Sequence, residues 1–127
     1  MIYLDTSVAL AHLLGEDRVP PSSLWNATLV SSRLLEYELW ARIHGRRLGA
    51  THAEAARALL AEVAFIELRP DVLARALDPF PVQVRTLDAL HLASIEFVRR
   101  HDRSLELASY DERLLQAARA LEIPIFS

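Results

Sequence analysis

The sequence predicts an α/β fold with three layers, in which a central parallel sheet of about five strands is covered by helices on both faces. Five short apolar runs have the length of strands, and helical patterns lie between them. Strands and helices that alternate in this way form parallel sheets, because each helix returns the chain to the same end of the next strand. The apolar character of the runs fits a sheet that is buried on both faces.

The predicted elements are bounded by residues that commonly start and stop helices and strands. The strands are expected at MIYL (1–4), TLVS (28–31), VAFIEL (63–68), SLELAS (104–109) and IPIF (123–126). Helix starts are expected at Ser32, at Thr51 with Glu54 as a capping box, at Thr86, and at Ser109 with Glu112 as a second capping box. Pro70 and the PFP of 79–81 bracket a further short helix, and PPSS (20–23) interrupts the first crossover.

The composition indicates one globular domain, which we expect to span residues 1–127. With 52% hydrophobic residues, a chain of 127 residues has enough apolar material for a core. The absence of cysteine excludes a disulfide framework, a thiolate zinc site and a thiol nucleophile, and it suits a reducing compartment. No basic segment precedes the first apolar run, which Gly15 and Glu16 end, so we expect neither a signal peptide nor a membrane span. These features favour a cytoplasmic protein.

The charged residues exclude several classes of phosphate chemistry. The formal net charge of −3 gives no bulk field that indicates nucleic acid, although a bound cation can reverse the sign locally. All 14 basic residues are arginine. Phosphatases of the haloacid-dehalogenase type and receiver domains also gather acids after a first strand, but both normally require a lysine in the site. The lack of lysine and a total of three glycines also exclude a P-loop.

Four carboxylates lie just after a predicted strand or in the first turns of a helix, each in a different crossover, where ligands of open parallel sheets bind. They are Asp5, Glu38, Asp88 and Asp111. Oxygen ligands without cysteine or a histidine pair at helical spacing are typical of a site for Mg²⁺ or Mn²⁺. Asp88 stands in a helix that is apolar on nearly every side, and an ionised carboxylate there needs a partner or a ligand. A bound cation would meet that need.

Each acid also has a simpler structural interpretation. Asp5 can be the N-cap of the first helix. Asp111 can be an acid in the first turn of the last helix, where its charge interacts favourably with the helix dipole. Glu38 can form an i,i+4 pair with Arg42 on a solvated face. The helical phase argues against this pair, because Glu38 shares its face with apolar and small residues whereas Glu36 points the opposite way. The four acids together are therefore more specific than any one of them.

Several other residues lie near these acids or on exposed faces. His91 is either a general base or, as we favour, a packed group that supports the site. Arg42, Arg85 and Arg113 are candidates for contacts with phosphate oxygens. The basic clusters at 46–47 and 99–103 are expected to be solvated helix ends, facing away from the site. An outward apolar stripe is expected to pack against a partner, a second subunit or the next helix, and it consists of Tyr37, Trp40 and Ile43.

Four segments resemble the PIN-domain family, and within it the VapC toxins of bacterial toxin–antitoxin pairs. In chain order they are IYLDTS, VSSRLLEYELWAR, RTLDALHLAS and ASYDERLLQAARALEIPI. The resemblance covers essentially the whole chain, and LDALHLA followed by YDERL is its most specific part. The double proline at 20–21 departs from many relatives, whose crossover is more regularly helical there. This departure concerns the local shape of a substrate groove.

The resemblance implies an endoribonuclease that depends on Mg²⁺ or Mn²⁺. The acidic metal site of the family maps to the four acids named above, and Thr6 falls where a hydroxyl residue usually follows the first aspartate. The resemblance also implies a flavodoxin-like sheet, a homodimer and inhibition by a cognate VapB-type antitoxin. Metal ions can supply the nucleophile and relieve charge on the phosphate, so no side-chain nucleophile is needed. The alternative that stays open is a catalytically silent PIN-like module that binds RNA or protein.

Overall fold

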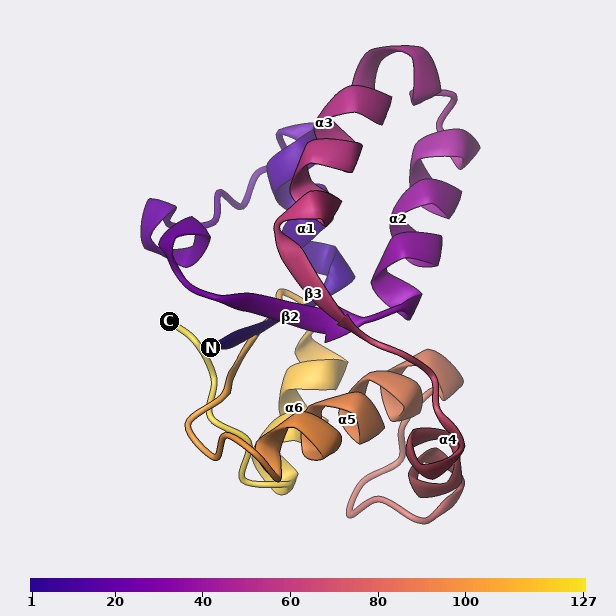
Figure 1. Cartoon of the computed structure of the whole chain (residues 1–127), viewed down its shortest axis with the longest axis vertical. Coiled ribbons are helices and arrows are strands. Elements are labelled where there is room, and N and C mark those ends of the chain that lie inside the picture. Colours follow the sequence, from indigo (N-terminus) through magenta and orange to yellow (C-terminus); the bar gives the residue numbers. More distant parts are fainter.

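The computed structural model describes residues 1–127, and its centre is a parallel sheet of four strands (Figure 1). In spatial order β3-β2-β1-β4, the strands are β3 (Val63–Ile66), β2 (Leu29–Ser32), β1 (Ile2–Leu4) and β4 (Glu106–Ala108). All three neighbouring pairs are parallel, as predicted. The expected fifth strand is reduced to one bridge between Ile125 and Leu107, partly because Pro124 has no N–H to extend the ladder.

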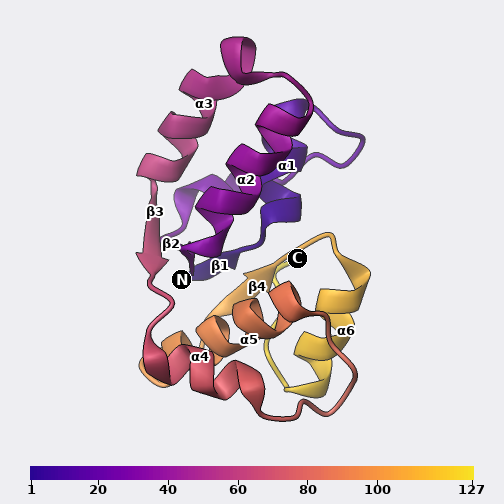
Figure 2. The same cartoon turned by 90° about the vertical axis from the view of Figure 1, so that its right-hand side faces the viewer.

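Helices cover both faces of this sheet, which confirms the predicted three-layer α/β/α architecture. On one face lie α1 (Thr6–Leu14), α2 (Leu34–Gly45) and α3 (Gly49–Ala61), and on the other lie α4 (Pro70–Leu77), α5 (Thr86–Arg99) and α6 (Glu112–Ala120) (Figures 1 and 2). A short 3-10 helix, η1 (Ser22–Asn26), follows the two prolines of the first crossover. None of the helices has both the length and the apolar character that a membrane span needs.

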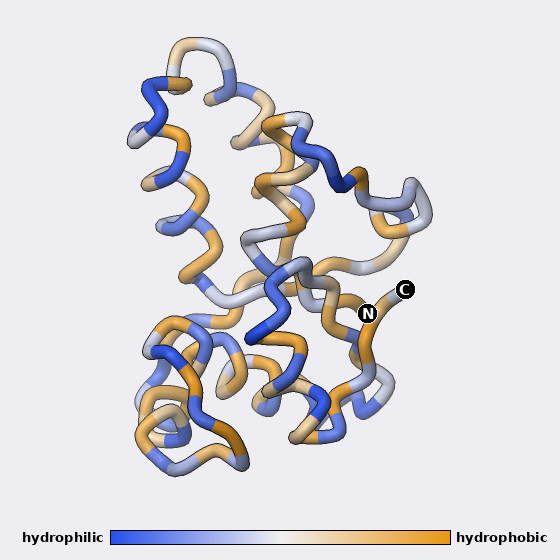
Figure 3. The backbone as a smooth tube through the Cα atoms, turned by 180° about the vertical axis from the view of Figure 1, so that it is seen from behind, coloured by the Kyte–Doolittle hydropathy of each residue, from blue (hydrophilic) through white to orange (hydrophobic).

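The two faces of the sheet have separate hydrophobic cores. Because side chains alternate along a strand, Ile2 and Leu4 of β1 enter the core under α1 to α3, whereas Tyr3 enters the core with Leu92 and Leu114 of α5 and α6. Along the helices, hydrophobic and hydrophilic residues alternate in the way expected of helices with one buried side (Figure 3). Stable packing on both faces fixes the strand ends that carry the acidic residues.

Two predicted helix starts are wrong in detail. Helix α3 begins at Gly49, and the hydroxyl of Thr51 donates to the Leu48 carbonyl instead of capping the helix. Helix α6 is capped by Asp111, and the hydroxyl of Ser109 accepts the N–H of Asp111. The start expected at Thr86 is right to within one residue, because Thr86 is the first residue of α5. Each proposed cap was a suitable residue within three positions of the real start, where the sequence pattern alone discriminates poorly.

The chain reverses its direction across the sheet next to β1. Strands β2 and β3 are added on one side of β1, and β4 then pairs with its other side. Such a switch leaves a crevice at the carboxyl ends of the two strands, since the connections leave them toward opposite faces. Asp5 follows β1, and Asp111 lies shortly after β4. The topology therefore places the first and the last of the four acids beside one another.

Candidate active site

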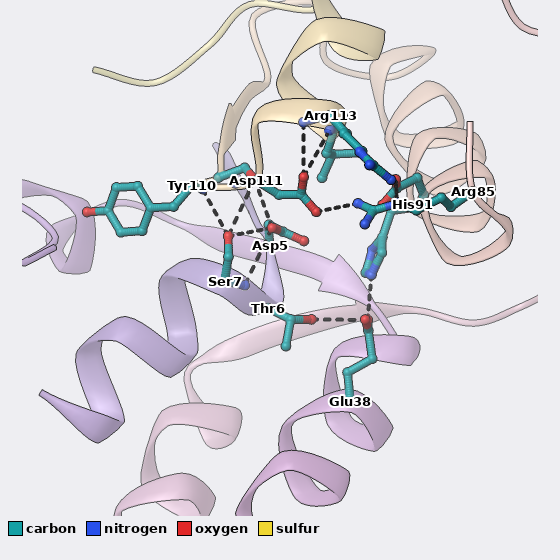
Figure 4. Close-up of polar contacts among 12 residues, drawn as sticks. Asp5, Thr6, Ser7, Glu38, Arg85, His91, Tyr110, Asp111 and Arg113 are labelled. Carbon is teal, nitrogen blue, oxygen red and sulfur yellow. Dashed lines mark hydrogen bonds and ion pairs between the residues drawn. The ribbon is translucent and has the colours of Figure 1, made fainter. Parts of the chain in front are cut away.

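The four predicted acids line one groove at the carboxyl edge of the sheet. Asp5 and Asp111 are the N-caps of α1 and α6, Glu38 lies in the second turn of α2, and Asp88 lies in the first turn of α5. The groove has a volume of about 880 Å³. Figure 4 shows Asp5, Glu38 and Asp111 converging from three different elements. The structure thus brings together side chains that are far apart in the sequence.

Asp5 caps α1 and faces the groove at the same time. Its Oδ2 accepts hydrogen bonds from the Ser7 hydroxyl at 2.6 Å, from the Ser109 hydroxyl at 2.8 Å and from the Ser7 N–H at 3.4 Å. Its Oδ1 has no hydrogen-bond donor from the protein. The capping role that seemed an alternative to a functional role is therefore compatible with it, because the two oxygens are used differently.

Asp111 has the same division of its two oxygens. Its Oδ1 accepts the backbone N–H groups of Arg113 and Leu114 at 3.0 and 3.4 Å, which caps α6. Its Oδ2 points to the other side and accepts from Nη2 of Arg85 at 2.6 Å. The helix start thus fixes the carboxylate and leaves one oxygen for a cationic group.

Glu38 is the acid of α2 that faces the groove. Its Oε1 accepts from the Thr6 hydroxyl at 3.0 Å and lies 2.6 Å from Nε2 of His91, while Oε2 has no donor. Glu36 instead pairs with Arg33 near the surface, and Glu38 makes no pair with Arg42. The predicted helical phase is right for both acids.

The prediction of an outward apolar stripe on α2, made from the same helical phase, is wrong. Tyr37 is exposed, but Ile43 is fully buried, and Trp40 packs against the core beneath α1 to α3. The reason is that α2 contacts both α1 and α3, so its apolar contact surface is broader than one stripe. Of the three expected partners of this stripe, the next helix is the one that the structure shows.

Asp88 obtains its partner from its own chain. It is 8% exposed, and burial raises its pKa, an effect that the hydrogen bond and the charge of Arg85 oppose. Nε of Arg85 donates to Oδ2 of Asp88 at 2.8 Å, and Nη2 of the same side chain reaches Asp111. Arg85 was expected to contact phosphate, but here it bridges two of the acids. These two hydrogen bonds raise the pKa of Arg85.

His91 is a packed group and lies between Tyr3 and Glu38. It is 1% exposed, and its Nδ1 lies 2.7 Å from the hydroxyl of Tyr3. The Tyr3 hydroxyl also accepts the Ser32 N–H at 3.1 Å. Burial would lower the pKa of His91, but the hydrogen bond with Glu38 and the nearby carboxylates raise it overall. Because an ionised carboxylate can only accept, Nε2 carries the proton that faces Glu38.

Three residues that hold the acids in place, directly or through His91, were not predicted from the sequence: Tyr3, Ser7 and Ser109. Ser7 and Ser109 lie two residues from Asp5 and Asp111, a spacing at which serine commonly bonds to nearby backbone and side chains. That spacing was a usable signal. Tyr3 stands in a buried apolar strand, where its hydroxyl needs a hydrogen-bond partner. The sequence indicated the need but could not identify His91 as that partner.

The donor chemistry of the groove fits a hard divalent cation. All four side chains are carboxylates, and in each of them at least one oxygen is free of backbone and hydroxyl donors. No three of the acids are close enough to hold one ion in the observed arrangement. Arg85 explains part of this, because its guanidinium lies against both Asp88 and Asp111. A cation would have to draw the acids together and displace that guanidinium from at least one of them.

The groove continues from the acids along α2 to its C-terminal end. Arg42 and Arg46 line this part, together with the small residues Ala41 and Gly45. Arg46 is exposed at the end of α2, as expected, but the expectation that it faces away from the site is wrong. The groove runs along the helix, so both ends of α2 contribute to it. Arg113 contributes its backbone N–H to Asp111, and its side chain does not line the groove.

A parallel α/β/α sandwich with four acids at its switch point is the arrangement expected of a PIN domain. Residues 2–120 match the family described as PIN domain, and the chain belongs to this family. It is 30% identical over 126 residues to a protein named Ribonuclease VapC47 from Mycobacterium tuberculosis (strain CDC 1551 / Oshkosh), covering 94% of this chain and 90% of that protein. No solved structure matches the chain significantly.

Proposed function

We propose that this chain is a VapC-type toxin, an endoribonuclease that hydrolyses RNA phosphodiester bonds with Mg²⁺ or Mn²⁺. The observation that carries the proposal is the convergence of Asp5, Glu38, Asp88 and Asp111 on one groove of a PIN domain. The similarity to a protein named as a ribonuclease supports the choice of RNA as substrate. Four carboxylates at one edge repel one another, which a purely structural role would not favour.

The four acids would hold the cation, with Asp5 and Asp111 as the foremost candidates for direct ligands. When bound, the cation supplies a nucleophilic hydroxide near neutral pH and offsets the negative charge that develops on the phosphate. The Ser7 and Ser109 hydroxyls fix one oxygen of Asp5, and the N-terminus of α6 fixes one oxygen of Asp111. Each carboxylate would therefore present its second oxygen in a defined direction.

Glu38 and Asp88 would bind the cation directly or through water, or would orient the attacking water. Thr6 and His91 both contact Oε1 of Glu38, so they hold this carboxylate with Oε2 toward the groove. His91 acts here as a positioning residue. Its Nε2 is committed to Glu38, and its ring is buried, so it is poorly placed to take a proton from water.

The partners and surroundings of the protein are part of the proposal. We infer that residues 1–127 act as one PIN domain, that the protein is a homodimer in the cytoplasm, and that a VapB-type antitoxin neutralises it. The match over 94% of this chain and 90% of the VapC relative supports the single domain and the antitoxin partner. Size measurements on the purified protein, alone and with a co-expressed antitoxin, test the homodimer and the complex directly.

The deciding experiment is the chemistry of the cleaved RNA ends. Hydrolysis by an activated water should leave a 3′-hydroxyl and a 5′-phosphate, should not need a 2′-hydroxyl at the scissile position, and should stop in EDTA. A 2′,3′-cyclic phosphate, or cleavage that survives chelation, would contradict the proposal. His91→Ala should lower the rate without changing the ends. RNA binding without cleavage under every metal condition would instead favour a catalytically silent module.

A further inference from the structure

The end of the groove that is remote from the acids is lined by arginine side chains without protein partners. Arg42 and Arg46 border it, and neither takes part in any of the ion pairs of the structure. By contrast, Arg33, Arg75 and Arg85 are each paired with a carboxylate. Unpaired guanidinium groups on the wall of a groove are available for anionic groups of a ligand, and planar guanidinium matches phosphate well.

The two arginines continue the line of Glu38 along α2. They stand four and eight residues after Glu38, which corresponds to about 6 and about 12 Å along the helix axis. Side chains four residues apart share one helix face, so the acid and both arginines border the same groove. A chain of phosphates that leaves the acidic end would therefore meet the two positive groups in succession.

Gly45 lines this part of the groove and leaves open space beside it. It lies at the end of α2 without a positive φ, and a Cβ added there would meet nothing within 4 Å. The backbone therefore does not require glycine at this position, although glycine is among the poorest helix formers. Gly45 and Ala41 are the small residues that line the groove between Glu38 and Arg46. The space along the helix is thus free for a ligand.

The opposite wall of the groove does not offer the same chemistry. Arg18 lines it, but its guanidinium lies 5.2 Å from the ring centre of Tyr110 and donates to the Tyr110 carbonyl. Glu16 and Asp17 line the groove next to it, so this loop has mixed charge. The positive wall is the α2 wall, which defines the side on which a phosphate backbone would lie.

We propose that Arg42 and Arg46 form a phosphate track, which binds the backbone of single-stranded RNA beside the scissile phosphate. The inference rests on the proposed ribonuclease function and deepens it by naming where the substrate strand lies. A groove of about 880 Å³ is within the usual range for small-ligand clefts, which is enough for a few nucleotides of one strand and too small for a duplex. Phosphate contacts carry no sequence information, so the track sets the affinity for RNA and the direction in which the strand lies, but not the sequence that is bound.

The test measures binding of a short, labelled, random-sequence single-stranded RNA to the Asp5→Asn protein in Mg²⁺, so that cleavage is suppressed. Arg42→Ala with Arg46→Ala should weaken binding on the order of tenfold, and should make the salt dependence of log K shallower by about 0.7 per arginine. Arg103→Ala is the matched control, because Arg103 is exposed and lies outside the groove. The control should change neither quantity.

Gly45 gives an independent test that leaves both arginines in place. Gly45→Glu sets a carboxylate between them and should weaken RNA binding, whereas Gly45→Ala should bind RNA as well as the parent and should not melt at a lower temperature. The track would be overturned if the double arginine variant kept the parent affinity and salt slope, or if a duplex RNA bound as tightly as the single strand. In that event, cleavage by the wild-type protein would leave the proposed function intact. A wild-type protein that neither cleaves nor binds RNA would overturn both.

Discussion

Nε2 of His91 lies 2.6 Å from Oε1 of Glu38, and it joins a fully buried ring on α5 to the acid that α2 presents to the groove. The contact crosses 53 residues of sequence. On the far side of the ring, Tyr3 of β1 holds Nδ1 at 2.7 Å. The orientation of a groove carboxylate is therefore tied to the centre of the sheet, and variants of these buried residues should affect both folding and the site.

Tyr3→Phe should destabilise the protein although it changes the side-chain volume in the core only slightly. It removes the hydroxyl that contacts His91 and accepts the Ser32 N–H, so two buried polar groups lose a partner. Such a loss costs about 1 to 3 kcal/mol. The free energy of unfolding in urea measures it. Tyr37→Phe, at an exposed position on α2, should stay within about 0.5 kcal/mol of the wild type. Equal stability of the two variants would show that the Tyr3 hydroxyl has no structural role.

Glu38→Gln should abolish RNA cleavage, whereas Glu36→Gln should retain most of it. Only Glu38 faces the groove, while Glu36 makes a surface pair with Arg33 that is worth at most about 1 kcal/mol. Initial cleavage rates on the same RNA measure the difference. Similar losses in both variants would exclude the assigned role of Glu38.

Mn²⁺ should raise the melting temperature of the wild-type protein. A ligand that binds only the folded state adds about 2.7 kcal/mol at a hundredfold excess over its dissociation constant. Differential scanning calorimetry with and without Mn²⁺ measures this, and Asp5→Asn should lose most of the increase. An equal increase in Asp5→Asn would mean that the ion binds elsewhere.

Arg85→Gln should bind Mn²⁺ more tightly than the wild type and be less stable without it. The guanidinium contacts Asp88 and Asp111, so its removal restores repulsion between these acids and leaves their oxygens free for the ion. Since Arg85 is half exposed, we expect a loss of stability of roughly 1 kcal/mol. Isothermal titration calorimetry gives the metal affinity. Weaker Mn²⁺ binding in this variant would show that Arg85 supports the ion site instead of competing for it.

The architecture could be predicted from the sequence because it depends on local patterns. Apolar runs bounded by turn residues located all four strands, and alternation with helices specified the parallel sheet. The strand expected at 123–126 is reduced to one bridge, because Pro124 stands at its second position, where pairing with β4 would need an N–H. The outward position predicted for Ile43 is wrong because α2 packs against two helices. The number of helices that surround α2 cannot be read from the pattern of α2 alone.

The positions of the acids were predictable, but their connections were not. Asp5 follows β1 directly and Asp111 lies shortly after β4, so the topology of a parallel sheet brings them to one edge. The bridge from Arg85 to Asp111 and the contact of Ser109 with Asp5 join residues 26 and 104 positions apart. Such side-chain contacts depend on the angles at which helices leave the sheet, and no periodicity of the sequence encodes them.

The central position of β1 has a consequence for synthesis on the ribosome. The first strand to emerge pairs with β4, and Asp5 receives the hydroxyl of Ser109, so the groove is complete only when the chain has been made beyond residue 111. Non-local pairing of this kind also slows folding. A nascent chain therefore has no assembled acidic site while it is being translated, and a nuclease of this topology would spare the messenger and the ribosome that are producing it until its release.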